Sequence, residues 1–272
     1  MTSGKRMMHK TDRHNAIMTS LRQAGSTSIA ELVQKLGVSD ETVRRDVKVL
    51  ESRGLLERVH GAVILADHGG EAAFQKRMAQ NAAIKRAIAE AAAREVEDGD
   101  AVMIDSGTTT AYVARALLAR RNLFVVTNGT EIARTLAGGA GNRVHLPGGE
   151  MRSDDYAVFG ETSQAFIRNF RAKIAILSIG AIHHDGGYMD FHLQETEMAR
   201  AMIRQSSKVI VVADRSKFHT QAPVSVCGFA DVGTLVTERT PPTPILRQLE
   251  QHEVRVIEVG SAPAAQAAPE AG

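Results

Sequence analysis

The segment SIAELVQKLGVSDETVRRDVKVLESRGLLERVHGA, residues 28–62, contains two amphipathic patterns separated by one short turn. In the first pattern apolar side chains recur at i, i+3, i+4 and i+7, which predicts one buried helix face. These side chains are Ile29, Leu32, Val33 and Leu36. Thr27 or Ser28 can cap this helix at its N-terminus. Gly37 tolerates the positive φ of a tight turn, and Ser39 can cap the helix that follows. The segment therefore predicts a helix-turn-helix.

The helix expected from residue 40 to about residue 53 has two faces. Its apolar face consists of Val43, Val47 and Leu50. Its charged face consists of Glu41, Arg44, Arg45 and Lys48, again at i, i+3, i+4 and i+7. A basic face next to a positive helix N-terminus is typical of contact with DNA phosphates. Phosphates repel Glu41, which can instead accept from a cytosine amino group. A charged face that is only solvated is the alternative interpretation.

Residues 55–64 predict two short strands around a turn at His60. A hairpin directly after a basic helix is typical of the wing of a winged helix-turn-helix, and an earlier helix over residues 13–24 completes this unit. Arg58 and His60 are expected to touch backbone phosphate or the minor groove, with His60 as an ordinary turn residue the alternative. The predicted DNA-binding residues are Thr27, Ser28, Ser39, Glu41, Thr42, Arg44, Arg45, Lys48, Arg58 and His60.

This segment resembles the DNA-binding segment of the DeoR family of bacterial sugar-metabolism regulators. The pattern VS..TVRRD...LE..GLL.R.HG, which starts at Val38, carries the resemblance. Family members commonly have Gly-Gly after the wing histidine, whereas this chain has Gly61 and Ala62, so the geometry of the wing turn stays open. The resemblance implies that this unit binds double-stranded operator DNA.

The charged residues are unevenly divided along the chain. Residues 1–65 carry 11 Lys and Arg against 7 Asp and Glu, whereas the remaining residues carry 22 against 24. A basic head on a slightly acidic body suits a polyanion-binding module joined to another domain. The single cysteine, Cys227, excludes an intrachain disulfide and favours a reducing cytoplasm. No apolar run is long enough to span a bilayer or to form a secretory signal, so we expect a cytoplasmic protein without a membrane partner.

A polar, glycine-bearing stretch after the wing marks the expected domain boundary. We expect a DNA-binding domain at 1–66, a linker at 67–71, an α/β domain at 72–260 and a disordered Ala/Pro-rich tail at 261–272. An Ala-rich helical stretch in two pieces, from about residue 72 to residue 96, opens the second domain.

Strands and helices then alternate. Strands are expected at 101–105, 123–127, 143–146, 173–179, 208–213, 233–237 and 254–259. Helices are expected near 109–119, 129–137, 161–169, 194–206 and 244–252. Nearly continuous apolar strands between helical patterns indicate a buried, mostly parallel sheet covered by helices, a Rossmann-like α/β fold.

Functional residues of such folds lie where strand C-termini meet helix N-termini. The first strand is followed by Asp105, Ser106, Gly107, Thr108 and Thr109. Gly107 permits a sharp turn, and the backbone N–H groups and hydroxyls after it are donors typical of a phosphate-binding helix N-terminus. A plain helix cap is the alternative interpretation.

Three further strand ends carry polar or glycine residues. The residues at these strand ends are Thr127, Asn128, Gly148, Gly149, Arg152 and Lys217. Taken singly, these residues fit a helix cap, a turn or a surface lysine. Their convergence with the first junction on one edge of one sheet predicts a pocket for an anion.

The segments DSGTT, TN, PGGEMR and VADRSKF resemble, in the same order, the sensor domain of the DeoR family. The resemblance runs from about residue 13 to about residue 259 and implies a fold related to ribose-phosphate isomerase, glucosamine-phosphate deaminase and CoA-transferase. The implied effector-binding residues are Asp105, Ser106, Gly107, Thr108, Thr109, Thr127, Asn128, Gly148, Gly149, Arg152, Glu195 and Lys217. His219 stands where the family often has Gly, which leaves the shape of that loop open. The segments GGEMRSDD and GYMDF resemble members that respond to glycerol-3-phosphate.

The leading hypothesis is a repressor of a sugar or polyol catabolic operon. A homodimer or homotetramer would bind operator DNA and be released by a phosphorylated sugar or polyol. One alternative is a sugar-phosphate isomerase or deaminase that uses Asp105 and Glu195 as acid and base. A second alternative is a constitutive DNA-binding protein.

No catalytic residue, cofactor or metal site is assigned from the sequence. A deaminase-like arrangement of histidine and carboxylate is not visible in the sequence. The histidine-rich segment at 183–185 and His192 lack a matched second pair of ligands, so they are interpreted as solvated loop residues.

Overall fold

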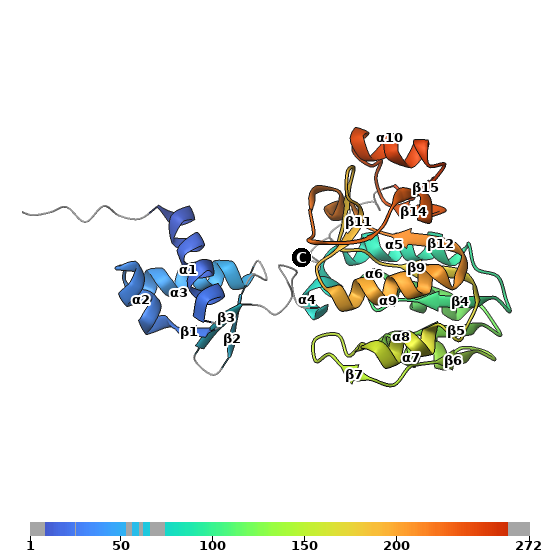
Figure 1. Cartoon of the computed structure of the whole chain (residues 1–272), viewed down its shortest axis with the longest axis horizontal. Coiled ribbons are helices and arrows are strands. Elements are labelled where there is room, and N and C mark those ends of the chain that lie inside the picture. The colour runs from blue at the N-terminus through green and yellow to red at the C-terminus, as the bar shows by residue number, and fades with distance from the viewer. Residues whose placement is uncertain (1–8, 25, 53–55, 60–61, 66–73, 261–272) are drawn as a thin grey trace, which may run out of the picture. The chain divides into compact units, whose positions relative to one another are not determined.

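The computed structural model describes residues 9–24, 26–52, 56–59, 62–65 and 74–260 (Figure 1). The chain divides into two compact units, Met1–Ala73 and Phe74–Gly272, here called the N-terminal unit and the C-terminal unit. The expected linker at 67–71 and the expected tail at 261–272 lie outside the described residues.

The N-terminal unit is a winged helix-turn-helix. Its elements are α1 (Lys10–Ala24), β1 (Ser26–Ser28), α2 (Ile29–Leu36), α3 (Asp40–Ser52), β2 (Leu56–Val59) and β3 (Ala62–Leu65). Ser28 is the N-cap of α2 and forms a capping box with Glu31, so of the two candidate caps it is the one used. Gly37 ends α2 with a φ of 64°, in the left-handed region that favours glycine.

The apolar faces expected in this unit form its core. Its buried residues are Ile17, Leu21, Ile29, Leu32, Leu36, Val43, Val47, Leu50, Leu56 and Val63. The hairpin strands β2 and β3 pair antiparallel, as expected. Strand β1 was not expected; it pairs antiparallel with β3, so the sheet order is β1-β3-β2. A three-residue strand has too few positions for its alternation to be recognised in a sequence.

The C-terminal unit is built on a seven-stranded sheet in which every pairing is parallel. The strands are β4 (Ala101–Ile104), β5 (Phe124–Thr127), β6 (Arg143–His145), β9 (Ala172–Leu177), β12 (Ser206–Val212), β14 (Thr234–Thr237) and β15 (Arg255–Glu258). All seven match the expected strands, which confirms the predicted parallel α/β fold.

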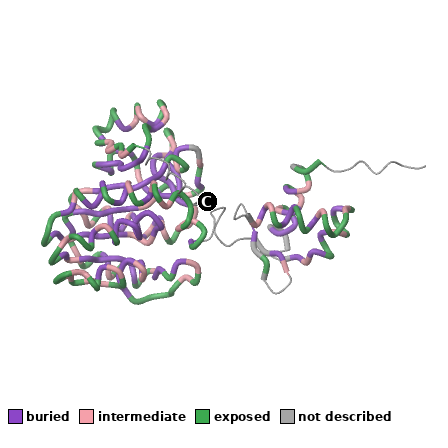
Figure 2. Tube along the Cα trace, turned by 180° about the vertical axis from the view of Figure 1, so that it is seen from behind, coloured by how far each residue is buried: buried purple, intermediate pink, exposed green. Residues whose placement is uncertain are grey.

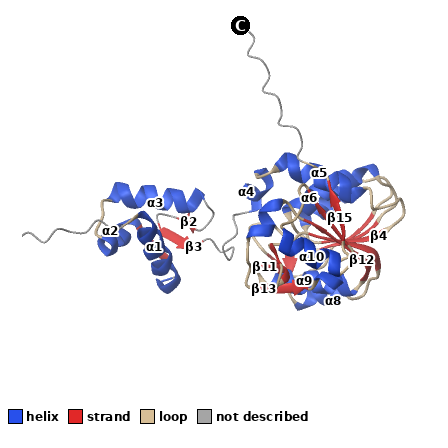
Figure 3. Cartoon of the chain, turned by 90° about the horizontal axis from the view of Figure 1, so that it is seen from above, coloured by secondary structure: helices blue, strands red, loops and turns tan. Residues whose placement is uncertain are grey.

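Helices cover both faces of this sheet (Figure 3). One face packs against α5 (Ala82–Ala93), α6 (Thr108–Ala116) and α7 (Thr130–Ala137), and the other against α8 (Glu161–Ile167), α9 (Leu193–Arg204) and α10 (Thr243–Gln251). Alternate residues of a strand therefore enter different cores: Val102 and Ile104 lie in one and Met103 in the other. Figure 2 shows the buried residues following the strands and the inner faces of the helices.

The strand order is β15-β14-β12-β9-β4-β5-β6. The direction in which the chain adds strands to the sheet reverses between β4 and β9. The chain first moves outward from β4 through β5 to β6. It then returns to β9, beside β4, and moves the other way. Ligands of open α/β sheets bind in the crevice that such a reversal leaves at the carboxyl ends of the strands.

Several short elements complete the C-terminal unit, and of these the sequence pattern predicted only the first helix. They are the helix α4 (Phe74–Ala79), which with α5 forms the expected two-piece helical stretch, the 3-10 helices η1 (Leu117–Ala119), η2 (Arg215–His219) and η3 (Phe229–Asp231), and the strands β7 (Glu150–Met151), β8 (Val158–Phe159), β10 (Ala181–His183), β11 (Gly187–Asp190) and β13 (Val224–Cys227). The last three strands form a small antiparallel sheet, and β7 pairs with β8.

Candidate operator interface and effector pocket

The outer face of α3 carries the four charged residues expected there. Glu41, Arg44, Arg45 and Lys48 are all exposed. Arg44 pairs with Asp40, and Arg45 Nη2 lies 2.9 Å from Glu41 Oε1. Exposed i,i+4 pairs of this kind contribute about 0.3–0.5 kcal/mol, so a DNA phosphate can replace the carboxylates at little cost.

The small polar residues expected at the interface fix the two helix N-termini. Thr27 is buried and donates to Glu31 Oε2 at 3.1 Å, while Ser28 Oγ accepts from Glu31 N at 3.2 Å. Ser39 Oγ accepts from Thr42 N at 3.3 Å, and the two hydroxyls lie 2.8 Å apart. Ser28 and Ser39 therefore accept from the first turns of α2 and α3, and Thr27 and Thr42 support them.

The wing strand β2 is tied to α3 by Arg58. This side chain is exposed; its Nε lies 3.5 Å from Glu51 Oε2, and its Nη2 donates to Arg44 O at 3.5 Å. His60 lies outside the described residues. The structure thus places Arg58 beside the outer face of α3, as expected for a wing.

The sequence pattern did not predict the role of one residue of α3. Asp46 is buried and binds two side chains of α1: Arg13 Nε at 2.7 Å and His14 Nε2 at 3.0 Å. An aspartate among the inward-facing residues of the basic helix could have predicted a buried ion pair from the sequence, because buried charges require partners.

At the reversal point of the sheet, Asp105 follows β4 and Ser178 follows β9. Asp105 Oδ2 accepts from Ser178 N at 2.9 Å and from Ser178 Oγ at 3.1 Å. Burial, aided by the nearby charge of Glu195, raises the pKa of Asp105 to about 7 against the lowering effect of these hydrogen bonds.

A small inner cavity opens at this point. Its lining residues are Asp105, Ser106, Asn128, Phe159, Ser178, Asp190, Glu195 and Met198. Asn128 is buried, and its Nδ2 donates to Ser106 Oγ at 3.2 Å and to Val158 O at 3.3 Å. Among the described residues its Oδ1 has no hydrogen-bond partner, so a ligand donor can satisfy it.

Arg152 connects the cavity to the loop between β7 and β8. Its Nη2 lies 2.5 Å from Glu195 Oε1, and its Nε donates to Asp155 Oδ1 at 3.0 Å. The guanidinium carbon also stacks 4.6 Å from the centre of the Phe159 ring. The structure thereby joins Arg152 and Glu195, which are 43 positions apart in the sequence.

A second space, the recess, lies next to the cavity. Its lining residues are Phe74, Ser106, Gly107, Ala111, Gly129, Glu131, Ile132 and Asp155. Gly107 and Gly129 are the N-caps of α6 and α7, and neither supplies a side-chain cap. Two helix N-termini with uncapped first-turn N–H groups therefore meet at one recess.

A buried lysine stands behind the first turn of α6. Lys85 of α5 is only 5% exposed, and its Nζ donates to Thr108 Oγ1 at 2.9 Å. The sequence pattern missed Lys85 because it lies in an Ala-rich helix 23 positions from Thr108. Its placement on the apolar face of that helix was the available signal.

The remaining expected residues are less closely grouped. Thr109 is buried in the first turn of α6. Thr127 is the last residue of β5, and its side chain is buried. Gly148 and Gly149 form an exposed turn before β7. Lys217 lies on η2, after β12 at the same sheet edge, but it is not among the lining residues of the cavity or the recess.

Comparison with known families gives a match in each unit. The DeoR-like helix-turn-helix domain matches residues 13–68, and the DeoR C terminal sensor domain matches residues 80–239. The chain belongs to the DeoR family.

Curated relatives of this DeoR-family chain are repressors. The HTH-type transcriptional repressor CsqR of Escherichia coli (strain K12) is 34% identical over 90% of this chain and 94% of its own length. The glycerol-3-phosphate regulon repressor of the same strain is 36% identical over 92% and 99%. Transcriptional repressor AccR of Agrobacterium fabrum (strain C58) is 37% identical over 84% and 89%. The protein is therefore a DNA-binding transcriptional repressor of the DeoR family, a regulator rather than an enzyme.

Solved structures resemble the DeoR-family chain only distantly. Ribose 5-phosphate isomerase A from Methanocaldococcus jannaschii gives a TM-score of 0.37 at 15% identity, over 51% of this chain and 55% of that one. The Pyrococcus horikoshii OT3 translation initiation factor eIF-2B gives 0.38 at 18% identity, over 81% and 78%. Similarities this weak carry no argument about function, and the Rossmann-like character rests on the sheet itself.

Two further observations bear on partners. His183, His184 and Asp185 bring three potential ligand atoms within 4.8 Å of one another; His184 and Asp185 are exposed, and His192 is not part of this group. His184 and Asp185 lie in the expected exposed turn, whereas His183 ends strand β10. In the described part of the chain, every helix is too short or too polar to cross a bilayer.

Proposed function

We propose that this DeoR-family repressor controls a sugar or polyol catabolic operon and leaves its operator when it binds a phosphorylated sugar or polyol. One observation carries the proposal. The inner cavity, rich in hydrogen-bond acceptors, and the recess, formed by two helix N-termini, meet at Ser106. Acceptors suit hydroxyl groups and helix N-termini suit phosphate, and a phosphorylated polyol carries both.

The recess is assigned to the phosphate. First-turn N–H groups after Gly107 and Gly129 point the positive ends of two helix dipoles at this space. The buried ammonium of Lys85, through its contact with Thr108 Oγ1, adds positive charge behind the first turn of α6. In this assignment Ser106 and Thr109 supply hydroxyl donors to the phosphate.

The inner cavity is assigned to the hydroxyl groups. Asp105, Glu195 and the unsatisfied Oδ1 of Asn128 are acceptors that line it. Arg152 holds Glu195 in place. Three lining carboxylates, including Asp190, disfavour a phosphate in the cavity itself and favour uncharged hydroxyls.

Glycerol-3-phosphate is the first compound to test. It is a phosphorylated polyol, and a relative covering 92% of this chain is named the glycerol-3-phosphate regulon repressor. Because the chain is about equally similar to a repressor with a different name, effector identity is tested with a panel.

The operator complex is proposed to contain a homodimer or homotetramer. A symmetric oligomer presents two α3 helices to half-sites separated by whole turns of DNA. An effector then acts by its differential affinity for the oligomer states that do and do not match this spacing.

Fluorescence anisotropy tests the proposal directly. Labelled DNA from upstream of the protein's own gene is titrated with the full chain at fixed salt, then with glycerol-3-phosphate and a panel of sugar phosphates. We expect release by one phosphorylated compound and no release by its dephosphorylated form. Specific binding that no phosphorylated compound disturbs contradicts the assigned effector class.

Matched variants locate the effector. Thr108→Ala and Lys85→Gln are expected to raise the effector concentration for half-release while operator affinity stays unchanged. Lys173→Gln is the control, because Lys173 pairs with Glu97 and Asp100 outside the site. Lys217→Ala measures whether this lysine, which lies outside the lining of the cavity and the recess, contributes to effector binding. An equal loss of operator affinity in the site variants assigns them a structural role instead.

A further inference from the structure

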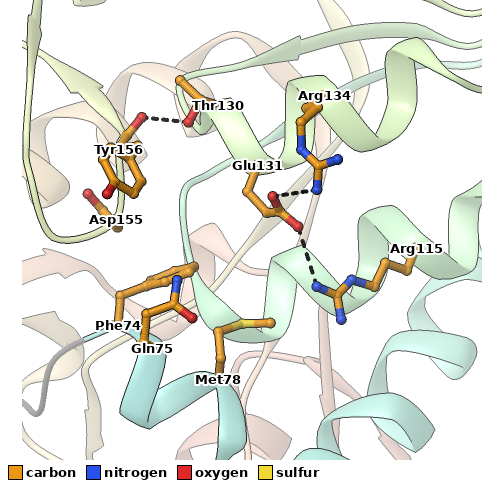
Figure 4. Close-up of a pocket in the computed structure, with 9 residues that line it drawn as sticks. All are labelled: Phe74, Gln75, Met78, Arg115, Thr130, Glu131, Arg134, Asp155 and Tyr156. Carbon is orange, nitrogen blue, oxygen red and sulfur yellow. Dashed lines mark hydrogen bonds and ion pairs between the residues drawn. The ribbon is translucent and has the colours of Figure 1, made fainter.

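A larger hollow, here called the outer hollow, lies next to the recess. Its lining residues are Phe74, Gln75, Met78, Arg115, Thr130, Glu131, Arg134, Asp155 and Tyr156 (Figure 4). It shares Phe74, Glu131 and Asp155 with the recess, and the recess shares Ser106 with the inner cavity. The three spaces are therefore neighbours in a series from the surface to the reversal point of the sheet, separated by the residues that they share.

Only the outermost space is large enough for a ligand. The outer hollow measures about 420 Å³, whereas the recess measures about 10 Å³ and the inner cavity about 20 Å³. Spaces of about 10–15 Å³ hold a single water molecule. A phosphorylated polyol therefore reaches the inner spaces only after a side chain between them and the outer hollow moves.

Of the three side chains that line both spaces, Phe74 is the apolar one, whereas Glu131 and Asp155 are held by salt bridges. Phe74 is 6% exposed, lines both the outer hollow and the recess, and opens the six-residue helix α4. In Figure 4 it lies below Asp155, with Glu131 on the opposite wall. A helix shorter than two turns is held by its contacts rather than by its own hydrogen bonds, so its first residue can move at low cost.

The contact that holds Phe74 leads back to the effector site. Phe74 N donates to both carboxylate oxygens of Asp154, at 3.1 and 3.2 Å. The neighbouring Asp155 is clamped by Arg152, which also binds Glu195 at the cavity wall. An effector that draws Arg152 or Glu195 toward itself weakens the clamp on the loop that anchors Phe74.

The guanidinium groups of the outer hollow can bind an anionic ligand. Arg115 Nη2 and Arg134 Nη2 share one carboxylate, lying 3.3 and 3.0 Å from Glu131 Oε1 and Oε2. Asp155 also lines the hollow, so two guanidinium groups stand against two carboxylates there. Each guanidinium group nevertheless carries several N–H donors in a fork that suits a phosphate group.

We propose, resting on the proposed function, that the outer hollow is the vestibule through which a phosphorylated effector reaches the recess, and that Phe74 is the gate between them. Opening the gate displaces the first residue of the C-terminal unit. That residue is also where the chain continues toward the N-terminal unit.

The first test measures access without any effector. In the full chain carrying Cys227→Ser and Ala111→Cys, the new thiol lines the recess behind Phe74. Its labelling rate is measured with the anionic reagent 2-sulfonatoethyl methanethiosulfonate. We expect Phe74→Ala to raise the rate about ten-fold, since removing a gate worth about 1.4 kcal/mol changes an opening equilibrium ten-fold.

Phe170→Ala is the matched control, because Phe170 packs against Phe124 and Phe166 and does not line the hollow. Phe74→Leu gives the same comparison with a smaller loss of packing if Phe74→Ala unfolds. Arg134→Gln is expected to slow the anionic reagent but not neutral methyl methanethiosulfonate. Equal labelling rates with and without the Phe74 ring overturn the gate.

The second test watches the gate while a ligand binds. The chain contains no tryptophan, so Phe74→Trp introduces a single tryptophan, which is excited at wavelengths that the tyrosines do not absorb; Phe170→Trp is the control. Glycerol-3-phosphate and inorganic phosphate are titrated by calorimetry and by fluorescence. Calorimetric binding with an emission shift at position 74 alone supports the gate, and binding with no shift there overturns it. If calorimetry detects no binding, the phosphate assignment of the proposed function fails, and the labelling rates still decide the gate.

Discussion

Asp105 and Asp46 are both withdrawn from water, yet their pKa values move in opposite directions. Burial dominates for Asp105 and, with the like charge of Glu195, raises its pKa to about 7. Burial also raises the pKa of Asp46, but hydrogen bonds from Arg13 and His14 bring it below the ordinary value. The partners of a buried carboxyl group, rather than burial alone, decide which form it takes.

Asp105 makes the stability of the C-terminal unit fall as the pH rises from 5 to 8. Its pKa is higher in the folded chain than in the unfolded chain, so the folded state binds more protons across this window. Relative to Asp105→Asn, the wild-type chain is expected to gain on the order of 2 kcal/mol between pH 8 and pH 5. Urea unfolding at both values measures this, and parallel pH profiles for the two proteins contradict the raised pKa.

Asp46→Asn is expected to loosen α1 from α3 in the N-terminal unit. Breaking a buried pair costs about 3 kcal/mol, which hydrogen exchange at residues 13–21 and 43–50 detects in the full chain. Because the pKa of Asp46 is lowered, its contribution is present above about pH 4 and is lost as the pH falls below that. Asp40→Asn, which removes only an exposed pair with Arg44, is the control and should leave exchange nearly unchanged. Similar exchange in both variants shows that the Asp46 pairs do not anchor α1.

Helix α3 combines the cations that we expect to contact DNA with carboxylates one turn earlier. Asp40 and Glu41 favour the N-terminus of the helix through its dipole, and they neutralise Arg44 and Arg45 until DNA is bound. The apolar face, with Val43 and Val47 fully buried, fixes which side of the helix remains outside. One helix thus encodes both its packing and its interface.

Arg45→Ala is expected to weaken operator binding and to lower the salt dependence by about one released ion. Glu41→Gln should strengthen binding at low salt, because it removes a carboxylate that competes with phosphate for Arg45. Anisotropy titrations at several salt concentrations measure both effects. Arg239→Ala, an exposed change in the C-terminal unit, is the control; if Arg45→Ala matches it, Arg45 lies outside the interface.

If the proposed effector acts on operator binding, its site and the operator site are joined by thermodynamic linkage. If the effector lowers operator affinity by some factor, operator DNA lowers effector affinity by the same factor. Calorimetric titration of glycerol-3-phosphate into the free chain and into its operator complex is expected to give two affinities with the ratio found by anisotropy. Thr108→Ala should reduce both effector affinities. A ratio that differs between the two experiments contradicts a two-site mechanism.

Local chemistry was sufficient to predict most elements of both units. The cap at Ser28, the turn at Gly37 and the two faces of α3 follow from side chains within a few positions of one another. The seven parallel strands were recognisable because a strand buried on both faces is apolar almost throughout. The short strands β7, β8, β10, β11 and β13 were missed because they lie outside the strand–helix alternation and include glycine or polar residues or span only two residues.

Sequence by itself thus determined the helix-turn-helix, its basic face, the parallel sheet and the polar strand ends. Only the tertiary structure decided that Asp46 clamps α1, that Lys85 lies behind Thr108, that Arg152 holds Glu195, and that Phe74 stands between the outer hollow and the recess. It also left Lys217 outside the lining of the inner spaces. Periodicity, caps and turns are fixed by neighbouring residues, whereas these contacts depend on the order of strands in the sheet, which brings distant residues to one edge.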